Sequence, residues 1–188
     1  MEPLFWLSLA LVVYVYLGYP VLIKLLAMNK TEIQKDLAEL PTVSILIAAF
    51  NEEECIEATL KNKVALDYPR DKLEIIVVSD ESEDNTDKIV EEFSTEVDTP
   101  VKLIRQVPRR GKTSGLNIIA PQATGEIIVF SDANSIYAED ALVKLVANFA
   151  DTSVGYVTGK MVYVNPEGSL VGDGCSSYMK YENWMREK

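Results

Sequence analysis

The sequence of 188 residues contains no histidine and only two cysteines, Cys55 and Cys175. The absence of histidine excludes catalytic triads that depend on histidine and every metal site with an imidazole ligand. The two cysteines lie far apart in the sequence and match no metal-ligand spacing, so neither a disulfide framework nor a zinc site is predicted. A reducing compartment, such as the cytosol, is the simpler setting for such a chain.

Basic residues are also scarce. The chain has 18 lysines and arginines against 29 acidic residues, which gives a net charge of -11 at pH 7. Because nucleic acid binding needs a basic surface, nucleic acid is not expected as a partner. An anionic ligand would need a metal ion or local basic residues to offset the repulsion.

The longest apolar run lies at the amino terminus. Residues 4–23 carry no charge and have the length of a membrane-spanning helix, and lysines follow directly. We expect an anchor over residues 1–28 that crosses the cell (inner) membrane once and is kinked or ended by Pro20. The positive-inside rule places the domain after the linker at 29–40 in the cytoplasm. The alternatives are a removed signal peptide, although a basic start and a cleavage site are missing, and a buried helix of a soluble core.

From residue 41 onward, apolar runs typical of strands alternate with helical patterns. The predicted strands are residues 43–49, 73–79, 101–106, 126–131 and, as a further extended segment, 154–164. Asn51, with Glu54, is expected to cap the first helix of this region in a capping box. The alternation predicts an α/β fold with a mostly parallel sheet and helices on both faces. Right-handed crossovers then bring several strand ends to one cleft.

The strand predicted at 126–131 ends in polar residues, with Asp132 and Asn134 two positions apart. Its continuous apolar run predicts a buried central strand, and ligands of parallel α/β sheets bind at the carboxyl ends of such strands. A carboxylate and an amide there are hard oxygen ligands suited to Mg2+ or Mn2+. The alternative is that the two side chains only turn the chain and cap the next helix.

The ends of the first two predicted strands supply Phe50, Glu52 and Asp80. An aromatic ring beside carboxylates can stack a base and accept protons from the base and the ribose. For the acidic turn that follows Asp80, the alternative is a solvated loop in which Ser82 or Asp84 caps the next helix.

A concentrated basic turn follows the third predicted strand and contains Arg109, Arg110 and Lys112. In an acidic chain such a turn suggests a contact with phosphate. The Gly-Lys-Thr sequence at 111–113 is not a P-loop, because Gln106 stands where that motif requires glycine. The first strand is not followed by a G-x-G-x-x-G turn, which argues against an NAD-type Rossmann enzyme.

Four segments in this order resemble the amino-terminal half of the family 2 glycosyltransferases, which include cellulose, chitin and hyaluronan synthases: AAFNEEE, VVSDESEDNTD, RRGKTSGLN and GEIIVFSDANS. The resemblance implies a GT-A fold and a divalent cation, Mg2+ or Mn2+. It also implies a nucleotide-sugar donor, often UDP-linked, and a saccharide or lipid acceptor. We therefore expect a glycosyltransferase domain over residues 41–188 that is incomplete at its carboxyl end.

The resemblance also assigns roles by position. It implies that Ala49, Phe50 and Glu52 line the nucleoside pocket and that Asp80 meets the base. It implies that Lys112 lies near the nucleotide and its phosphates.

In the same way, Asp132 and Asn134 occupy the D-x-D metal motif. Asn134 replaces the second acid, so it offers an amide oxygen but no charge. The general base of these enzymes lies in a later segment, and neither Asp173 nor Glu182 stands in a matching context. The sequence therefore predicts no catalytic base in this chain.

The leading hypothesis is a membrane-anchored, inverting glycosyltransferase, active in polysaccharide or cell-envelope synthesis, of which this chain is the donor-binding half. One alternative is a truncated, non-catalytic membrane protein that binds nucleotide sugars. Another is a soluble α/β domain with an incidental resemblance.

Overall fold

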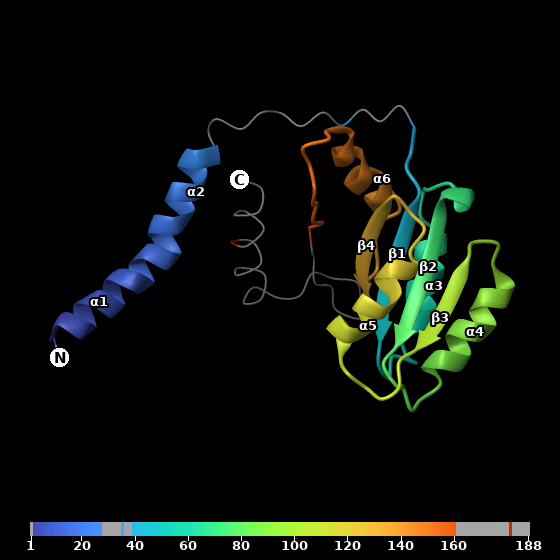
Figure 1. Ribbon diagram of the computed structural model, residues 1–188. Coiled ribbons are helices and arrows are strands. Elements are labelled where there is room, and N and C mark those ends of the chain that lie inside the picture. The colour runs from blue at the N-terminus through green and yellow to red at the C-terminus, as the bar shows by residue number, and fades with distance from the viewer. Residues whose placement is uncertain (1, 28–34, 36–38, 161–180, 182–188) are drawn as a thin grey trace. The chain divides into compact units, whose positions relative to one another are not determined.

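The computed structural model describes residues 2–27, 35, 39–160 and 181 (Figure 1). Most of the expected linker, the end of the expected extended segment at 161–164, and Asp173, Cys175 and Glu182 lie outside the described residues.

The amino-terminal segment is one continuous helix, built from α1 (Glu2–Val13), a π-helical turn η1 (Tyr14–Gly18) and α2 (Tyr19–Ala27). The stretch Glu2–Leu26 is long and apolar enough to cross a membrane, by length and composition. We expected Pro20 to kink or end the helix. It does not end it, because the helix continues to Ala27. The π-helical turn ends at Gly18, two residues before the proline, and there the Tyr19 N–H donates to the Tyr14 carbonyl.

The sheet contains four parallel strands in the order β3-β2-β1-β4. The strands are β1 (Val43–Ala49), β2 (Leu73–Ser79), β3 (Val101–Arg105) and β4 (Ile127–Asp132). The four apolar runs recognised in the sequence therefore form these strands, with bounds that differ by at most one residue. The parallel α/β architecture is confirmed.

The helices cover both faces of the sheet, as expected (Figure 1). They are α3 (Ile56–Val64), α4 (Thr86–Glu96), α5 (Lys112–Ile119) and α6 (Ala141–Val146), with short 3-10 segments η2 (Arg70–Lys72), η3 (Ala120–Gln122) and η4 (Ala147–Ala150). Side chains alternate along β1, so Ile45 and Ile47 pack with α3, α4 and α6. Leu46 packs on the opposite face with Ile119 of α5.

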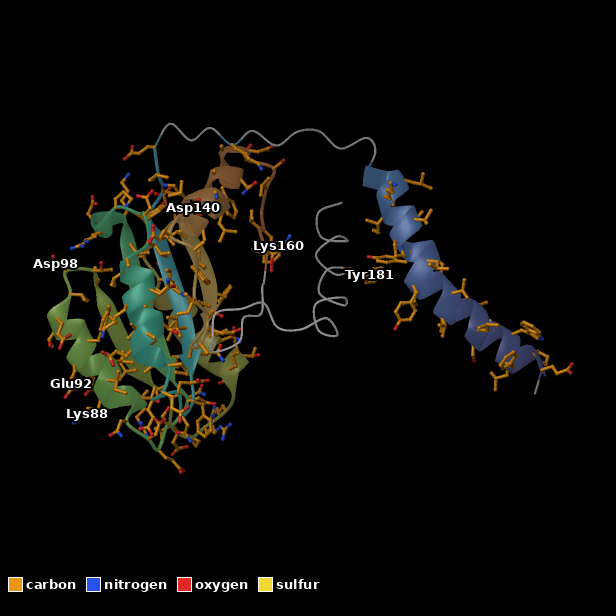
Figure 2. All side chains as sticks on the ribbon, turned by 180° about the vertical axis from the view of Figure 1, so that it is seen from behind. Lys88, Glu92, Asp98, Asp140, Lys160 and Tyr181 are labelled. Atoms are coloured by element: carbon orange, nitrogen blue, oxygen red, sulfur yellow. The ribbon has the colours of Figure 1, made fainter. Side chains whose placement is uncertain are left out.

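The outer side of α4 is solvated. Lys88 and Glu92 lie one turn apart on it and form an ion pair at 3.8 Å (Figure 2). The apolar residues Val90 and Phe93 are buried against the sheet. This is the amphipathic pattern of a helix that packs on a core by one face.

The capping box expected at Asn51 is wrong. Helix α3 begins at Ile56, and Asn51 adopts a left-handed conformation with φ of 53°. The Asn51 side-chain oxygen accepts a hydrogen bond from the Glu83 N–H at 2.8 Å. The polar run after β1 therefore forms a turn joined to the loop after β2, rather than the first turn of a helix.

The expectation of a buried central strand at residues 126–131 is also wrong for the part of the chain described. There β4 pairs with β1 alone, and the strands buried on both faces are β1 and β2. The Ile128 and Phe130 side chains of β4 are 39% and 57% exposed. A continuous apolar run thus identified a strand but not its place in the sheet, because periodicity carries no information on strand order.

The predicted extended segment at 154–164 forms no strand over its described part, residues 154–160. The expected helix opened by Glu139 and Asp140 is present as α6, which begins one residue after Asp140.

Candidate functional site

The order in which the chain adds strands to the sheet changes sides at β1, although all strands are parallel. From β1 the chain passes through β2 to β3, and it then crosses back to β4 on the other side of β1. In open parallel sheets, ligands bind at the carboxyl ends of the strands that flank such a switch point. A cleft of about 360 Å³ lies there, lined by Ala48, Ala49, Phe50, Glu52, Asp80, Arg109, Gly111, Lys112, Asp132, Ala133 and Asn134. The lining therefore contains every residue that the family resemblance assigned to the donor and the metal, whereas Arg110 of the basic turn is not part of it.

Asp80 follows β2 and is only 4% exposed. Its Oδ1 accepts hydrogen bonds from the Arg110 N–H at 2.9 Å and from the Gln106 side-chain amide, and its Oδ2 accepts one from the Gly111 N–H at 2.8 Å. Gly111 has a φ of 88°, a left-handed conformation that favours glycine. The buried carboxylate thus fixes the basic loop beside the cleft.

These contacts determine the charge state of Asp80. Burial alone would raise the pKa of the carboxyl, but the hydrogen bonds from Arg110, Gln106 and Gly111 and the nearby charge of Arg109 outweigh it, and the pKa lies below the usual value. Asp80 is therefore an anion at neutral pH, with its oxygens facing backbone donors.

The Phe50 ring forms another wall of the cleft. The Arg109 guanidinium lies over this ring, with its carbon 3.4 Å from the ring centroid, and its Nε lies 3.7 Å from Asp80 Oδ2. This is the spacing of a stacked planar group on an aromatic face. Phe50 therefore offers a stacking surface that a guanidinium covers in this structure.

Lys112 begins α5 and Asp132 ends β4, and the two side chains form an ion pair in the cleft. Asn134 lies just beyond in the same lining and is exposed. Among the described residues there is no group of three or more acidic or cysteine side chains placed to hold a metal ion. The donor set is thus one carboxylate and one amide. This suits Mg2+ or Mn2+, which commonly bind through one or two protein oxygens, water and substrate phosphates.

Glu52 lines the cleft, and its carboxylate accepts a hydrogen bond from the Cys55 thiol at 3.0 Å. Burial, with help from Glu52 and Glu54, raises the pKa of Cys55 to about 11. The thiol therefore stays protonated at neutral pH and is not a nucleophile.

The side chains of the acidic turn after Asp80 bind backbone groups at the start of α4, and Ser82 is buried, so the turn is not the solvated loop of the alternative interpretation. Asp84 Oδ1 accepts a hydrogen bond from the Thr86 N–H at 2.9 Å at the start of α4. Burial would raise the pKa of Asp84, but hydrogen bonds from Thr86 and Glu53 lower it overall. Arg105 pairs with Asp87 and donates to the Ser82 carbonyl at 3.0 Å, so it braces this turn rather than lining the cleft.

One residue of α3 near the cleft, Lys63, was not recognised as a candidate from the sequence. Lys63 is fully buried, and its ammonium lies 3.6 Å from the centroid of the Tyr137 ring, just beyond the strand end that carries Asp132. Burial lowers the pKa of Lys63 to about 8, which leaves most of the amine protonated at pH 7. One signal was available: Lys63 stands seven residues after Ile56, on the apolar face of the helix.

The chain belongs to glycosyl transferase family 2, whose family model matches residues 44–179. It is 40% identical over 141 residues to the probable glycosyltransferase YdaM of Bacillus subtilis, covering 73% of this chain and 34% of that protein. It is 34% identical over 158 residues to the beta-monoglucosyldiacylglycerol synthase of a Nostoc species, covering 82% and 34%. The poly-beta-1,6-N-acetyl-D-glucosamine synthase of Staphylococcus aureus is 35% identical over 132 residues, 70% of this chain and 31% of the synthase. The chain thus spans about a third of the length of these curated relatives.

Solved structures agree with the family. The mannosyltransferase PcManGT from Pyrobaculum calidifontis, in complex with GDP-Man and Mn2+, is 34% identical with a TM-score of 0.69, covering 76% of this chain and 43% of its own. Staphylococcus aureus TarS in complex with UDP-GlcNAc is 26% identical with a TM-score of 0.50, covering 54% and 29%. The GT-A fold and the membership of a transferase family are thereby confirmed.

Proposed function

We propose that the cleft binds a nucleoside diphosphate sugar, with UDP as the first nucleotide to test, together with Mg2+ or Mn2+. The observation that carries this proposal is the meeting of Phe50, Asp80, Lys112 and Asp132 at one switch point of the sheet. Each of these groups suits one part of such a ligand. The aromatic ring can stack a base, and the buried anion can accept the N–H of that base. The cation suits a diphosphate, and the exposed carboxylate suits a divalent ion.

In this proposal the nucleoside lies against Phe50. It either replaces the Arg109 guanidinium on the ring or stacks on the outer side of that guanidinium. Ala49 and Glu52 complete the wall of this pocket. Asp80 accepts a hydrogen bond from an N–H of the base: a carboxylate has about four acceptor sites, and the hydrogen bonds described above occupy three of them. The ion pair of Arg109 with Asp80 is long, at 3.7 Å, which leaves the guanidinium able to shift.

Asp132 and Asn134 would hold the metal ion, which supplies positive charge to a departing diphosphate when bound. Lys112, which also opens α5, places a second positive group beside that position. An acceptor hydroxyl, deprotonated by a base, would displace the nucleoside diphosphate from the anomeric carbon in a single step, and this inverts the configuration. The described residues supply the donor side of that displacement and no assigned base.

We further propose that residues 1–28 anchor the chain in the cell membrane, with residues 29–40 as linker and the domain from residue 41 in the cytoplasm. The apolar helix Glu2–Leu26 supports the anchor. The acceptor is proposed to be a saccharide or a lipid. Two relatives support this range, since one is named for a glucosyldiacylglycerol and another for a poly-N-acetylglucosamine product.

The test is calorimetric titration of UDP into the full chain in detergent, with Mn2+ and with EDTA, and a parallel titration with GDP. We expect binding that requires the metal, and we expect Asp132→Ala to weaken it by about tenfold or more. Lys144→Met, at an exposed residue of α6, is the control and should bind as the wild type does. Binding of GDP alone would transfer the proposal to guanosine donors, and no binding of either nucleotide by the folded chain would reject it.

A further inference from the structure

The turn that carries the proposed metal ligands, residues 132–137, is here called the metal turn. Within it, the Ser135 N–H donates to the Asp132 carbonyl at 3.3 Å, at the long end of hydrogen-bond distances. Its neighbours in β4 add the Ser131 hydroxyl, which donates to the Asp132 carbonyl at 3.2 Å, and the Tyr137 hydroxyl donates to the Phe130 carbonyl at 3.4 Å. Further hydrogen bonds come from α3, which lies far from the turn in the sequence.

Side chains of α3 satisfy successive backbone groups of the metal turn. The Thr59 hydroxyl donates to the Ala133 carbonyl at 2.6 Å, directly between the two proposed ligands. The Asn62 amide donates to the Tyr137 carbonyl at 2.9 Å and accepts from the Tyr137 N–H at 2.8 Å.

Lys63 completes this set. Its ammonium donates to the Ser135 carbonyl at 2.6 Å and to the Asn62 side-chain oxygen at 3.1 Å, while the Tyr137 ring covers it. Thr59, Asn62 and Lys63 are spaced three and four residues apart, so they lie on one face of α3. That face of α3 therefore forms hydrogen bonds with the turn from Ala133 to Tyr137.

Burial alone disfavours a lysine at this position. Lys63 has no exposed surface, and an ammonium removed from water is unfavourable unless its hydrogen bonds and neighbouring groups compensate. A methionine of similar length would fill the same space without that cost. The three acceptors of the amine all belong to, or directly hold, the metal turn.

We propose that α3 positions the metal turn through Lys63, with Thr59 and Asn62 as partners, so that the oxygens of Asp132 and Asn134 converge on one metal ion. The inference rests on the proposed function, because it assigns Lys63 a role in the metal-dependent donor site. Lys63 is a positioning residue and does not touch the metal or the donor. Two protein ligands are assigned among the described residues, so the site depends strongly on their placement, since Mg2+ and Mn2+ demand near-octahedral geometry.

The experiment uses the full chain in detergent and the variants Lys63→Met, Lys63→Arg and Lys61→Met. Lys61 is the matched control because it lies on the same helix, pairs with Glu57 at the surface and is 62% exposed. Binding of Mn2+ is followed by electron paramagnetic resonance, alone and with UDP, at a temperature where circular dichroism shows every variant folded.

We expect Lys63→Met to weaken the Mn2+-dependent binding of UDP by about tenfold or more, the effect typical of residues that orient metal ligands. Its thermal unfolding midpoint should change little, since the removal of a buried charge offsets the loss of the donor to the Ser135 carbonyl. Lys63→Arg keeps the charge and the hydrogen-bond donors, so its affinity for UDP with Mn2+ should lie between those of the wild type and Lys63→Met. Lys61→Met should bind within about twofold of the wild type, because an exposed pair contributes little.

Wild-type affinity in Lys63→Met would overturn the inference while leaving the proposed function intact. If the folded wild type shows no Mn2+-dependent binding of UDP or GDP, the proposed function fails, and the inference fails with it. Should Lys63→Met not fold, Thr59→Val provides the test, since it removes the hydroxyl that holds Ala133 and keeps the side-chain shape. It should weaken binding by about threefold to tenfold, and unchanged binding would overturn the inference.

Discussion

Lys112 at the start of α5 and Asp132 at the end of β4 form an ion pair that bridges the two sides of the cleft. Both side chains are about half exposed, at 58% and 49%, so the pair contributes little to stability. The same carboxylate is the proposed metal ligand, and the same ammonium is the proposed partner of the diphosphate. The proposed function therefore requires the pair to separate when metal and nucleotide bind.

Lys112→Met should change two affinities in opposite directions. Without the ammonium, Mn2+ alone should bind Asp132 more tightly, by up to about fivefold, because a competing cation is gone. UDP with Mn2+ should bind about tenfold more weakly, because the diphosphate loses a charged partner. Paramagnetic resonance measures the first affinity and calorimetry the second, and a shift of both in the same direction would contradict the assigned role of Lys112.

Phe50→Ala should separate base binding from phosphate binding. Loss of a stacking ring costs about 1–3 kcal/mol per base, so the affinity for UDP should fall by about tenfold or more. Affinity for pyrophosphate with Mn2+ should be unchanged, because Phe50 is not placed to contact phosphate in the proposal. The two ligands are compared by calorimetry, and an equal loss for both would show that the ring supports the fold of the cleft instead.

Asp80→Asn should alter the dependence of stability on pH. The pKa of Asp80 is lowered in the folded chain, so its stabilising contribution is complete above the pKa of the unfolded chain, about 3.9, and is lost as the pH falls through the lower folded value. The free energy of unfolding in urea should therefore differ between wild type and variant at pH 7, by about 1–3 kcal/mol, and the difference should shrink in acid. A constant difference between pH 7 and pH 3 would contradict this.

Gly125→Ala should destabilise the sheet at the end opposite the cleft. A methyl group at Gly125 would lie 2.5 Å from the Ser44 nitrogen and 2.7 Å from its hydroxyl oxygen. Since that oxygen also accepts the Gly125 N–H at 2.8 Å, strand β1 and the turn before β4 must separate. The loss should be about 1–3 kcal/mol in urea unfolding. Gly155→Ala, where no atom lies within 4 Å, is the control, and equal behaviour of the two variants would refute the close approach.

The sequence predicted the strands well because each is a short, mostly apolar segment ended by polar residues, and the sheet buries both faces of β1 and β2. The start of α3 was misjudged because the polar run after Asn51 has the composition of a first helical turn. Only its tertiary bonds to the loop after β2, such as the one from Glu83, place Asn51 in a left-handed conformation.

The residues of the candidate site were found from motifs at strand ends, and the structure brings them to one cleft, while their individual roles stay predictions. The sequence did not reveal how they are held. Gln106 binds Asp80, and Lys63 supports the metal turn, through contacts between residues 26 and 72 positions apart. Such long-range side-chain bonds leave no periodic trace in a single sequence.

The most direct test of the central claim is a crystal structure of the chain with UDP and Mn2+, using anomalous scattering to locate the metal. We expect one Mn2+ ion coordinated by Asp132 and Asn134 and by the diphosphate, with Lys112 released from Asp132 and the uracil against Phe50. A folded chain in which the ion and the nucleotide occupy another place, with the pair of Lys112 and Asp132 intact, would contradict the proposed function.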